Sequence, residues 1–374
     1  MAIDLDRAGV LAHRAWVQGL HGGTDLADLD VLTLGLQDTP AGSALLGLRN
    51  RSDATDLDGL ALALTVRGSP HLHRRADLPL IRAALWPRDN DMLRAYLGGY
   101  GDTLIDSGED GPRLLEVVAG QMRAAFPGDT ASKGELSGAV SPRVPDIARP
   151  WCDGCGVHHV ADGLFRLATL YAGIELVPHE GRKLQFRLGP DVPDLGGDDA
   201  ALVEFLRTTM RLVAPAKLGD LVLRLDTRSV TAPPAWLRPA WQDLEDELTE
   251  VRVDGTPRTV HAEAVAAMRN PLDPPPALLL PPRDALGLGS RPFLAPDRDL
   301  AKDVWRALGS PGTVVVDADI AGTWRARQAG RTLRLTLTAH RKLTARQRKA
   351  TEDQAELVAL SRGHTGPTEV TWED

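Results

Sequence analysis

The sequence predicts a mostly helical α+β protein in which small β-hairpins follow groups of helices. Three helices followed by a hairpin occur in three successive windows of the chain, and this is the order of a winged helix. Each hairpin is short and bounded by turn residues. A segment with six prolines, 270–284, then leads into a C-terminal part where strand patterns dominate.

We therefore expect three tandem winged-helix domains followed by a C-terminal α+β region that packs back on them. The expected boundaries are 1–105, 106–195, 196–265 and 266–374. On the pattern alone, an unrelated and mostly helical bundle remains the alternative.

Length and composition are those of a soluble globular chain. At roughly 100–150 residues per domain, 374 residues make two or three domains. Apolar residues make up 43% and charged residues 25%, as in ordinary globular proteins. No apolar run approaches the roughly 20 residues of a transmembrane helix, and the acidic N-terminus is unlike a signal peptide. Two cysteines cannot form a disulfide framework, so we expect a cytoplasmic protein. Because no transmembrane run is present, we expect no membrane partner.

The first window combines two helical segments, a marked helix start and a buried strand. Apolar spacing predicts helices over 4–20 and 26–36. Thr39 before Pro40 predicts the start of a third helix, because a hydroxyl caps the first turn and proline fits its first position. A buried strand over 61–66 and a turn over 67–70 follow.

The second and third windows repeat this order. In the second, Ser132 and Glu135 have the spacing of a capping box. In the third, Asp254-Gly255 is a strong hairpin turn. Helices are expected over 112–126, 132–140, 160–172, 201–213, 218–225 and 234–248, and hairpins over 174–178 with 183–188 and over 249–253 with 257–261.

The C-terminal region is expected to carry a basic hairpin. Strands are predicted over 313–316, 321–327 and 331–338, and a final helix over 344–360. Residues 321–350 hold nine basic side chains and no acid, although the chain has a net charge of −8. Because screening confines exposed charges to about 10 Å, this distribution matters more than the total. Residues 321–350 can form either a solvated face or a surface that binds an anionic partner, and the absence of acidic residues favours the binding surface.

The cations that we expect to contact DNA phosphates lie at three places. Arg and protonated His suit phosphate oxygens, although a solvated turn is the alternative for residues 71–75. The candidates are His71, His73 and Arg74 after the first strand, Arg182 and Lys183 at the second wing, and Arg325, Arg327, Arg341 and Lys342 in the basic stretch. Alternation places Arg325 and Arg327 on one face with Arg331 and Arg334.

Common enzyme signatures are missing from the sequence. It contains no Gly-rich phosphate loop, dinucleotide fingerprint, nucleophile elbow or His-Glu-x-x-His zinc helix. Cys152, Cys155, His158 and His159 form the one cluster with metal-ligand types. Structural zinc sites usually draw a second ligand pair from farther along the chain. We therefore expect two thiols in a tight turn and no metal, with these four residues as the weak candidates for zinc.

Several motifs occur along the chain in the same order as in a known family. They are 34–44 (Leu-Gly-Leu-Gln-Asp-Thr-Pro-Ala-Gly-Ser-Ala), 48–51 (Leu-Arg-Asn-Arg), 67–72 (Arg-Gly-Ser-Pro-His-Leu), 280–284 (Leu-Pro-Pro-Arg-Asp), 291–292 (Arg-Pro) and 314–325. They resemble the bacterial winged-helix DNA glycosylases, the AlkZ/YcaQ-like members of the tandem winged-helix DNA-binding domain superfamily. The motifs are short, but the resemblance covers nearly the whole chain.

The resemblance implies a fold, a substrate class and a catalytic motif. In that family three tandem winged helices form a concave DNA-binding surface, and the enzymes remove N-alkylated purines. The motif is glutamine, one intervening residue, then glutamine or aspartate. Gln37 matches the first position, Asp38 fills the intervening position and Thr39 departs from the second. The resemblance therefore supports the fold and DNA binding more strongly than catalysis.

We expect a monofunctional DNA glycosylase that excises cationic purine adducts in base-excision repair or genotoxin self-resistance. An amide and a carboxylate ahead of a helix start can hold a water and a negative charge, as this chemistry needs. A non-catalytic DNA-binding protein, either a lesion binder or a transcriptional regulator, is the alternative. In both cases we expect double-stranded DNA, alkylated for the enzyme, as the partner of a nucleoid-associated monomer that uses no cofactor.

Overall fold

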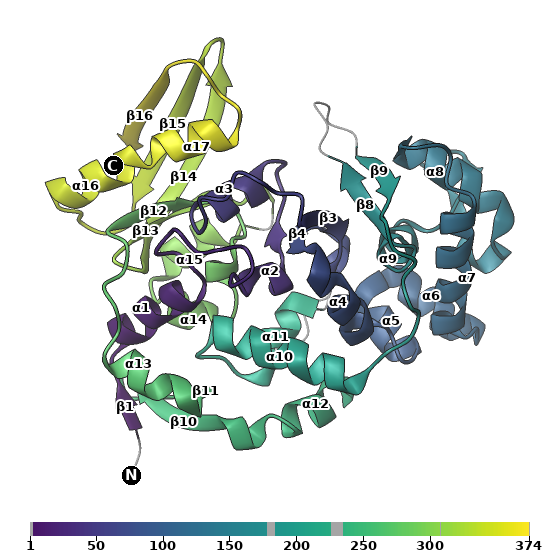
Figure 1. Ribbon diagram of the computed structural model, residues 1–374, viewed down its shortest axis with the longest axis horizontal. Helices are drawn as coiled ribbons and strands as arrows, with labels where there is room; N and C mark the ends of the chain where they lie inside the picture. The colour runs from purple at the N-terminus through teal and green to yellow at the C-terminus, as the bar shows by residue number, and fades with distance from the viewer. Residues whose placement is uncertain (1–2, 178–183, 226–234, 307, 374) are drawn as a thin grey trace. The chain divides into compact units, whose positions relative to one another are not determined.

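The computed structural model describes residues 3–177, 184–225, 235–306 and 308–373 (Figure 1). Helices and strands are mixed along the chain, which divides into two units. Unit 1 contains Met1–Leu57, Arg207–Leu221 and Leu244–Asp374. Unit 2 contains Asp58–Leu206 and Val222–Asp243. Within the described ranges, no helix is long and apolar enough to cross a membrane.

A three-stranded sheet of unit 1 joins the start of the chain to the third predicted hairpin. Strands β10 (Leu248–Val253) and β11 (Thr256–His261) are antiparallel, which confirms the hairpin around Asp254-Gly255. Both turn residues have positive φ, 47° and 75°, as a two-residue hairpin turn requires. Strand β1 (Ile3–Leu5) pairs parallel to β10. The predicted helix over 4–20 is therefore wrong at its start, and α1 (Arg7–Val17) begins only after Asp6.

A five-stranded sheet of unit 1 contains the predicted C-terminal strands. Its order is β12 (Ala277–Leu280), β13 (Gly312–Val316), β14 (Asp319–Ala329), β15 (Thr332–Ala339) and β16 (Thr368–Glu373). All neighbours are antiparallel except β15 and β16. β13, β14 and β15 confirm the prediction. β12 lies inside the proline-rich segment expected as a boundary, because four apolar residues between its prolines suffice for an edge strand.

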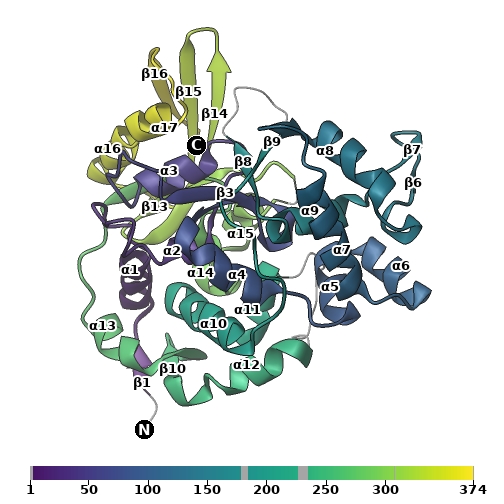
Figure 2. The ribbon, with the colours of Figure 1, turned by 45° about the vertical axis from the view of Figure 1, so that its right-hand side comes forward.

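Both faces of the first two strands, β12 and β13, are buried within unit 1, so these strands alternate between two cores. Leu278, Leu280 and Val315 face a core shared with α1, α13 (Val265–Arg269), α14 (Arg291–Leu294) and α15 (Arg298–Val304). Leu279, Val314 and Val316 face the other core. Helices α16 (Ala345–Asp353) and α17 (Ala355–Ser361) cover that second face, as Figures 1 and 2 show. The single helix predicted over 344–360 is thus two helices with a break at Gln354.

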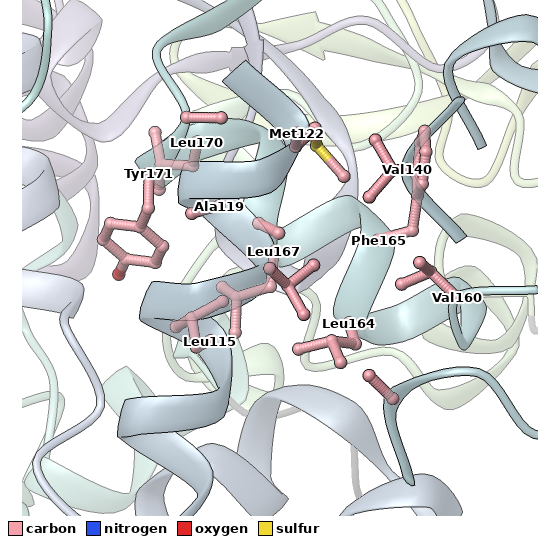
Figure 3. Packing of buried hydrophobic residues seen from close by; sticks show 14 of the residues in the cluster. Leu115, Ala119, Met122, Val140, Val160, Leu164, Phe165, Leu167, Leu170 and Tyr171 are labelled. Atoms are coloured by element: carbon pink, nitrogen blue, oxygen red, sulfur yellow. The ribbon is translucent and has the colours of Figure 1, made fainter. Parts of the chain in front are cut away.

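Unit 2 has its own sheet and its own helical core. Strands β4 (Pro70–Arg74), β3 (Leu60–Leu64), β8 (Ile174–Val177), β9 (Gln185–Leu188) and β5 (Ala131–Ser132) neighbour one another in this order. The helices are α4 (Leu78–Leu85), α5 (Asn90–Leu97), α6 (Gly99–Ser107), α7 (Gly111–Ala124), α8 (Lys133–Val140) and α9 (Asp162–Tyr171). Leu115 and Met122 of α7 pack with Leu164 and Phe165 of α9 in the core (Figure 3). The Ser132–Glu135 capping box is confirmed.

The remaining helices agree with the sequence except at two places. α10 (Asp199–Val213) and α11 (Leu218–Leu225) confirm the predicted helices. The helix predicted over 234–248 is wrong, because only α12 (Arg238–Gln242) is α-helical there, between two 3₁₀ turns. The segment 26–36 likewise keeps only α2 (Val31–Leu34).

Candidate active site

The motif Gln37-Asp38-Thr39 connects strand β2 (Leu36–Gln37) to helix α3 (Ser43–Arg49) in unit 1. Gln37 and Asp38 are half-buried and Thr39 is exposed. The predicted helix start at Thr39-Pro40 is wrong, because helix α3 begins only at Ser43. Gly42 at the N-cap has a φ of 86°, a left-handed conformation that ends the turn before the helix. Thr39 is therefore not the cap.

Asp38 supplies the missing cap from outside the helix. Its Oδ1 accepts a hydrogen bond of 3.0 Å from the Ala44 N–H. Burial raises the pKa of Asp38, and hydrogen bonds from the backbone N–H groups of Ala44, Gly42 and Ser43 only partly oppose this. These donors at a helix N-terminus favour a negative charge. The site therefore presents a carboxylate in a fixed position next to Gln37.

A buried ion pair fixes the other end of α3. Arg51 donates from both terminal nitrogens to Asp284, at 3.0 Å and 2.8 Å, and the two side chains are 0% and 3% exposed. Arg51 also donates to the carbonyl of Gly47 at 2.7 Å and of Gln18 at 2.9 Å. The family motifs at 48–51 and 280–284 are thus joined in space. Their charged residues hold the helix that follows the candidate site.

A second buried arginine extends this network. Arg14 donates to the carbonyl of Leu286 at 2.9 Å and also to the carbonyls of Val213 and Leu288. Burial lowers the pKa of Arg14 to about 9, although the charge of Asp284 opposes the shift. One carboxylate therefore balances two buried cations, so Asp284 is central to the stability of unit 1.

The histidines expected to contact DNA lie in the sheet of unit 2. His71 and His73 are 2% and 0% exposed on β4. Their ring nitrogens lie 3.1 Å and 2.9 Å from the hydroxyl oxygen of Thr65. The alternative of a solvated turn is also wrong for 71–74, because these residues belong to strand β4, whose alternate side chains point inward. Buried rings cannot reach a phosphate in this arrangement.

The other cations of the first two windows gain no support from the structure as DNA contacts. Arg74 is half-buried, and its Nε donates to both carboxylate oxygens of Asp77 at 3.2 Å and 3.1 Å. Asp77 therefore neutralises the positive charge of Arg74 that was expected to contact phosphate. Arg182 and Lys183 lie outside the described residues.

The basic hairpin has the predicted face for Arg325, Arg327 and Arg334, whereas Arg331 lies in the turn between β14 and β15. Arg325 and Arg327 alternate along β14, and Arg327 is directly opposite Arg334 of β15. Arg334 pairs with Glu369 at 3.0 Å, because the unpredicted strand β16 brings that acid alongside. Arg325, Arg327, Arg341 and Lys342 are exposed, and no carboxylate in the described part of the chain forms an ion pair with them.

A cleft of about 570 Å³ beside this hairpin was not predicted. Asp303 of α15 accepts a hydrogen bond of 2.6 Å from Thr323, and His340 lies 3.4 Å away. Although burial raises it, hydrogen bonds from Thr323, Arg306 and His340 lower the pKa of Asp303 overall. Sequence spacing gives no signal for this cleft, because its lining comes from separate helices and strands.

Three of the four candidate metal ligands come together in unit 2. Ligand atoms of Cys152, Cys155 and His159 lie within 4.8 Å of one another. His158 is directed elsewhere, with Nδ1 3.2 Å from the carbonyl of Arg149. Both cysteines are free thiols.

Comparison with known proteins adds a family and a fold. The family described as DNA glycosylase AlkZ-like matches residues 32–360, a range that includes the motif at 37–39, the Arg51–Asp284 pair and the basic hairpin. The solved structure of the Streptomyces sahachiroi DNA glycosylase AlkZ is similar, with a TM-score of 0.73 and 21% identity. The similarity covers 99% of this chain and 100% of that chain. No curated protein sequence matches significantly.

Proposed function

We propose that this chain, which belongs to the AlkZ-like DNA glycosylase family, excises cationic, N-alkylated purines from duplex DNA. As a DNA glycosylase it acts on DNA and belongs to DNA repair. The observation that carries the proposed substrate class is the half-buried carboxylate of Asp38, held by the Ala44 N–H beside Gln37.

The chemistry needs charge stabilisation more than acid catalysis. An N7- or N3-alkylated purine already carries a positive charge, so the C1′–N bond breaks with its electron pair going to the base. The sugar then has oxocarbenium character, which a fixed negative charge stabilises. Water adds to C1′ and releases its proton to bulk solvent. The products are the free base and an abasic site.

The three motif residues can be given separate roles. We assign the electrostatic role to Asp38, because backbone N–H groups hold its carboxylate in place. We assign the orientation of the attacking water to Gln37, whose side-chain amide has both a donor and an acceptor. Thr39 is exposed and cannot take a proton from water at neutral pH, so we give it no essential role.

DNA binding is assigned to the basic hairpin and to a series of winged helices. The order α7, β5, α8, α9, β8 and β9 in unit 2 is that of a winged helix and supports the second of the three proposed domains. Arg325, Arg327, Arg341 and Lys342 are exposed cations suited to phosphate. We propose that a monomer binds alkylated duplex DNA at the nucleoid through these groups.

The test is incubation of the protein with duplex DNA that contains N7-alkylguanine or N3-alkyladenine. We expect released base in the supernatant and abasic sites that are cut by mild alkali. Protein that binds these duplexes but releases no base from several adducts would show that the proposed substrate class is wrong.

A further inference from the structure

We propose that Cys152, Cys155 and His159 bind a zinc ion that holds together the small hairpin of β6 (Trp151–Cys152) and β7 (Val157–His158) in unit 2. Two thiolates and an imidazole are ligands that zinc prefers. With a Zn–S distance of about 2.3 Å, tetrahedral ligand atoms lie just under ~4 Å apart. The three ligand atoms are already within 4.8 Å of one another, so small side-chain rotations complete the site.

The backbone between the two cysteines forms a tight turn. The N–H groups of Cys155 and Gly156 both donate to the carbonyl of Cys152, at 3.2 Å and 2.8 Å. Gly156 has a φ of 66°, which a residue without a side chain adopts at little cost. The turn therefore places both thiols beside the same strand pair, in which Cys152 is opposite Val157.

The ring of His159 is oriented as a metal ligand. Its Nδ1 lies 2.8 Å from the carbonyl of Val160, so this nitrogen carries the proton and donates. Nε2 then keeps its lone pair, as in histidine ligands whose other nitrogen donates to a carbonyl. The tautomer needed to bind zinc is thus set by the backbone.

His158 provides an internal contrast. His158 is opposite Trp151 in the strand pair and Cys152 is opposite Val157, so His158 and Cys152 point to opposite faces. The His158 ring packs edge-on against Trp151 with centroids 5.2 Å apart. His158 is therefore not a fourth ligand. The three protein ligands leave one coordination position, which we assign to water.

The hairpin also lacks another source of stability. Each strand has two residues, and every residue from 151 to 159 is exposed or half-buried. Trp151 and Val157 are 55% and 52% exposed, so the strands themselves bury little apolar surface. An isolated hairpin of this kind has little stability in water, and small modules are commonly stabilised by a bound metal ion.

A redox dithiol is the competing role for a Cys-x-x-Cys sequence. A helix N-terminus is one of the features that make such pairs reactive. Here Cys152 ends β6, Cys155 lies in the turn before β7, and helix α9 begins only at Asp162. The position favours a metal ligand pair.

The test is the zinc content of the full chain, expressed with added zinc and dialysed without chelator. We expect about one zinc per chain in the wild type and less than about a tenth in Cys152→Ser and Cys155→Ser. His159→Gln should also lose most of its zinc, and the matched control His158→Gln should keep it. Because the serine variants could fail to fold, cobalt added to metal-free wild-type protein is the second measurement. It should give a thiolate-to-cobalt absorption band at one equivalent.

Three results would overturn the proposal. The first is a wild type with little zinc and no cobalt band. The second is a Cys152–Cys155 disulfide in protein that rejects both metals, which would assign a redox pair. The third is unchanged zinc in the serine variants, which would mean adventitious metal elsewhere. None of these readouts depends on glycosylase activity.

Discussion

We propose that Asp38 and Gln37 divide between them the two tasks that excision of a cationic base requires. Gln37→Ala removes the amide that we assign to the attacking water. Excision should fall about 10²–10³-fold, the size expected for loss of one preorganised polar group. Single-turnover release of N7-alkylguanine measures this effect. Thr39→Ala is the control, because Thr39 is exposed and does not cap α3. If both variants lose activity equally, the assignment to Gln37 is wrong.

Asp38→Asn removes the charge but keeps an acceptor for the Ala44 N–H. Excision should fall about 10²-fold or more, with little change in the unfolding midpoint. In the wild type, activity should decline as pH falls through the pKa of Asp38, which burial raises above its ordinary value. Since this pKa is higher in the folded than in the unfolded chain, protonation stabilises the fold, and the decline is not acid unfolding at Asp38. Normal excision by the asparagine variant would exclude the electrostatic role.

At the scale of elements, α3 depends on one long-range ion pair. Asp284→Asn leaves Arg51 and Arg14 in a buried region without their shared negative charge. Breaking a buried pair typically costs about 3–5 kcal/mol, and we expect a loss of this size in the free energy of unfolding. Urea unfolding followed by circular dichroism measures it. Asp299→Asn is the control, because its pair with Lys302 is 82% and 77% exposed and should leave the midpoint nearly unchanged. Equal midpoints for the two variants would contradict this role.

The basic hairpin is the element we expect to bind phosphate. Changing Arg325, Arg327, Arg341 and Lys342 together to Glu should abolish duplex binding and leave the thermal midpoint almost unchanged, because all four are exposed. Each lost contact should reduce the slope of log K against log salt by about one. Fluorescence anisotropy at several salt concentrations measures both. Lys349→Glu is the control, since Lys349 already pairs with Asp353. Unchanged affinity of the fourfold variant would mean that the face is only solvated.

Across the whole molecule, elements set by local sequence could be predicted and those set by distant partners could not. The Asp254-Gly255 hairpin and the Ser132–Glu135 capping box depend on neighbouring residues, and both are confirmed. β1 pairs with β10, whose residues lie far along the chain, so no local pattern indicates it. The Arg51–Asp284 pair is missed for the same reason, because its partners are 233 positions apart.

The sequence indicated which residues belong to the candidate site, but not how they are arranged. The motif drew attention to residues 37–39, and Thr39 was expected to cap the helix. In the structure the helix begins only after Gly42, and Asp38 accepts the hydrogen bond from the Ala44 N–H in its first turn. His71 and His73 were expected to contact DNA because protonated histidine suits phosphate oxygens. In the structure both rings are buried, and both lie within hydrogen-bond distance of the Thr65 hydroxyl. The sequence could not show that a single hydroxyl serves two histidines.

The proposed roles of the hairpin and the motif together predict selection by the charge of the lesion. In this proposal the exposed cations of the hairpin contact the DNA backbone, which is the same in damaged and undamaged duplex. Discrimination then falls to the site, where Gln37 cannot act as an acid and ionised Asp38 has no proton to give. A neutral leaving base needs general acid catalysis, commonly worth about 10²–10⁴-fold, and a cationic base does not. We therefore expect single-turnover excision of N7-alkylguanine to exceed that of uracil or O6-alkylguanine by about 10³-fold or more, at equal binding affinity. Duplexes that differ only in the lesion measure both quantities under the same salt conditions. Comparable excision of a neutral base would show that a proton donor outside this motif takes part.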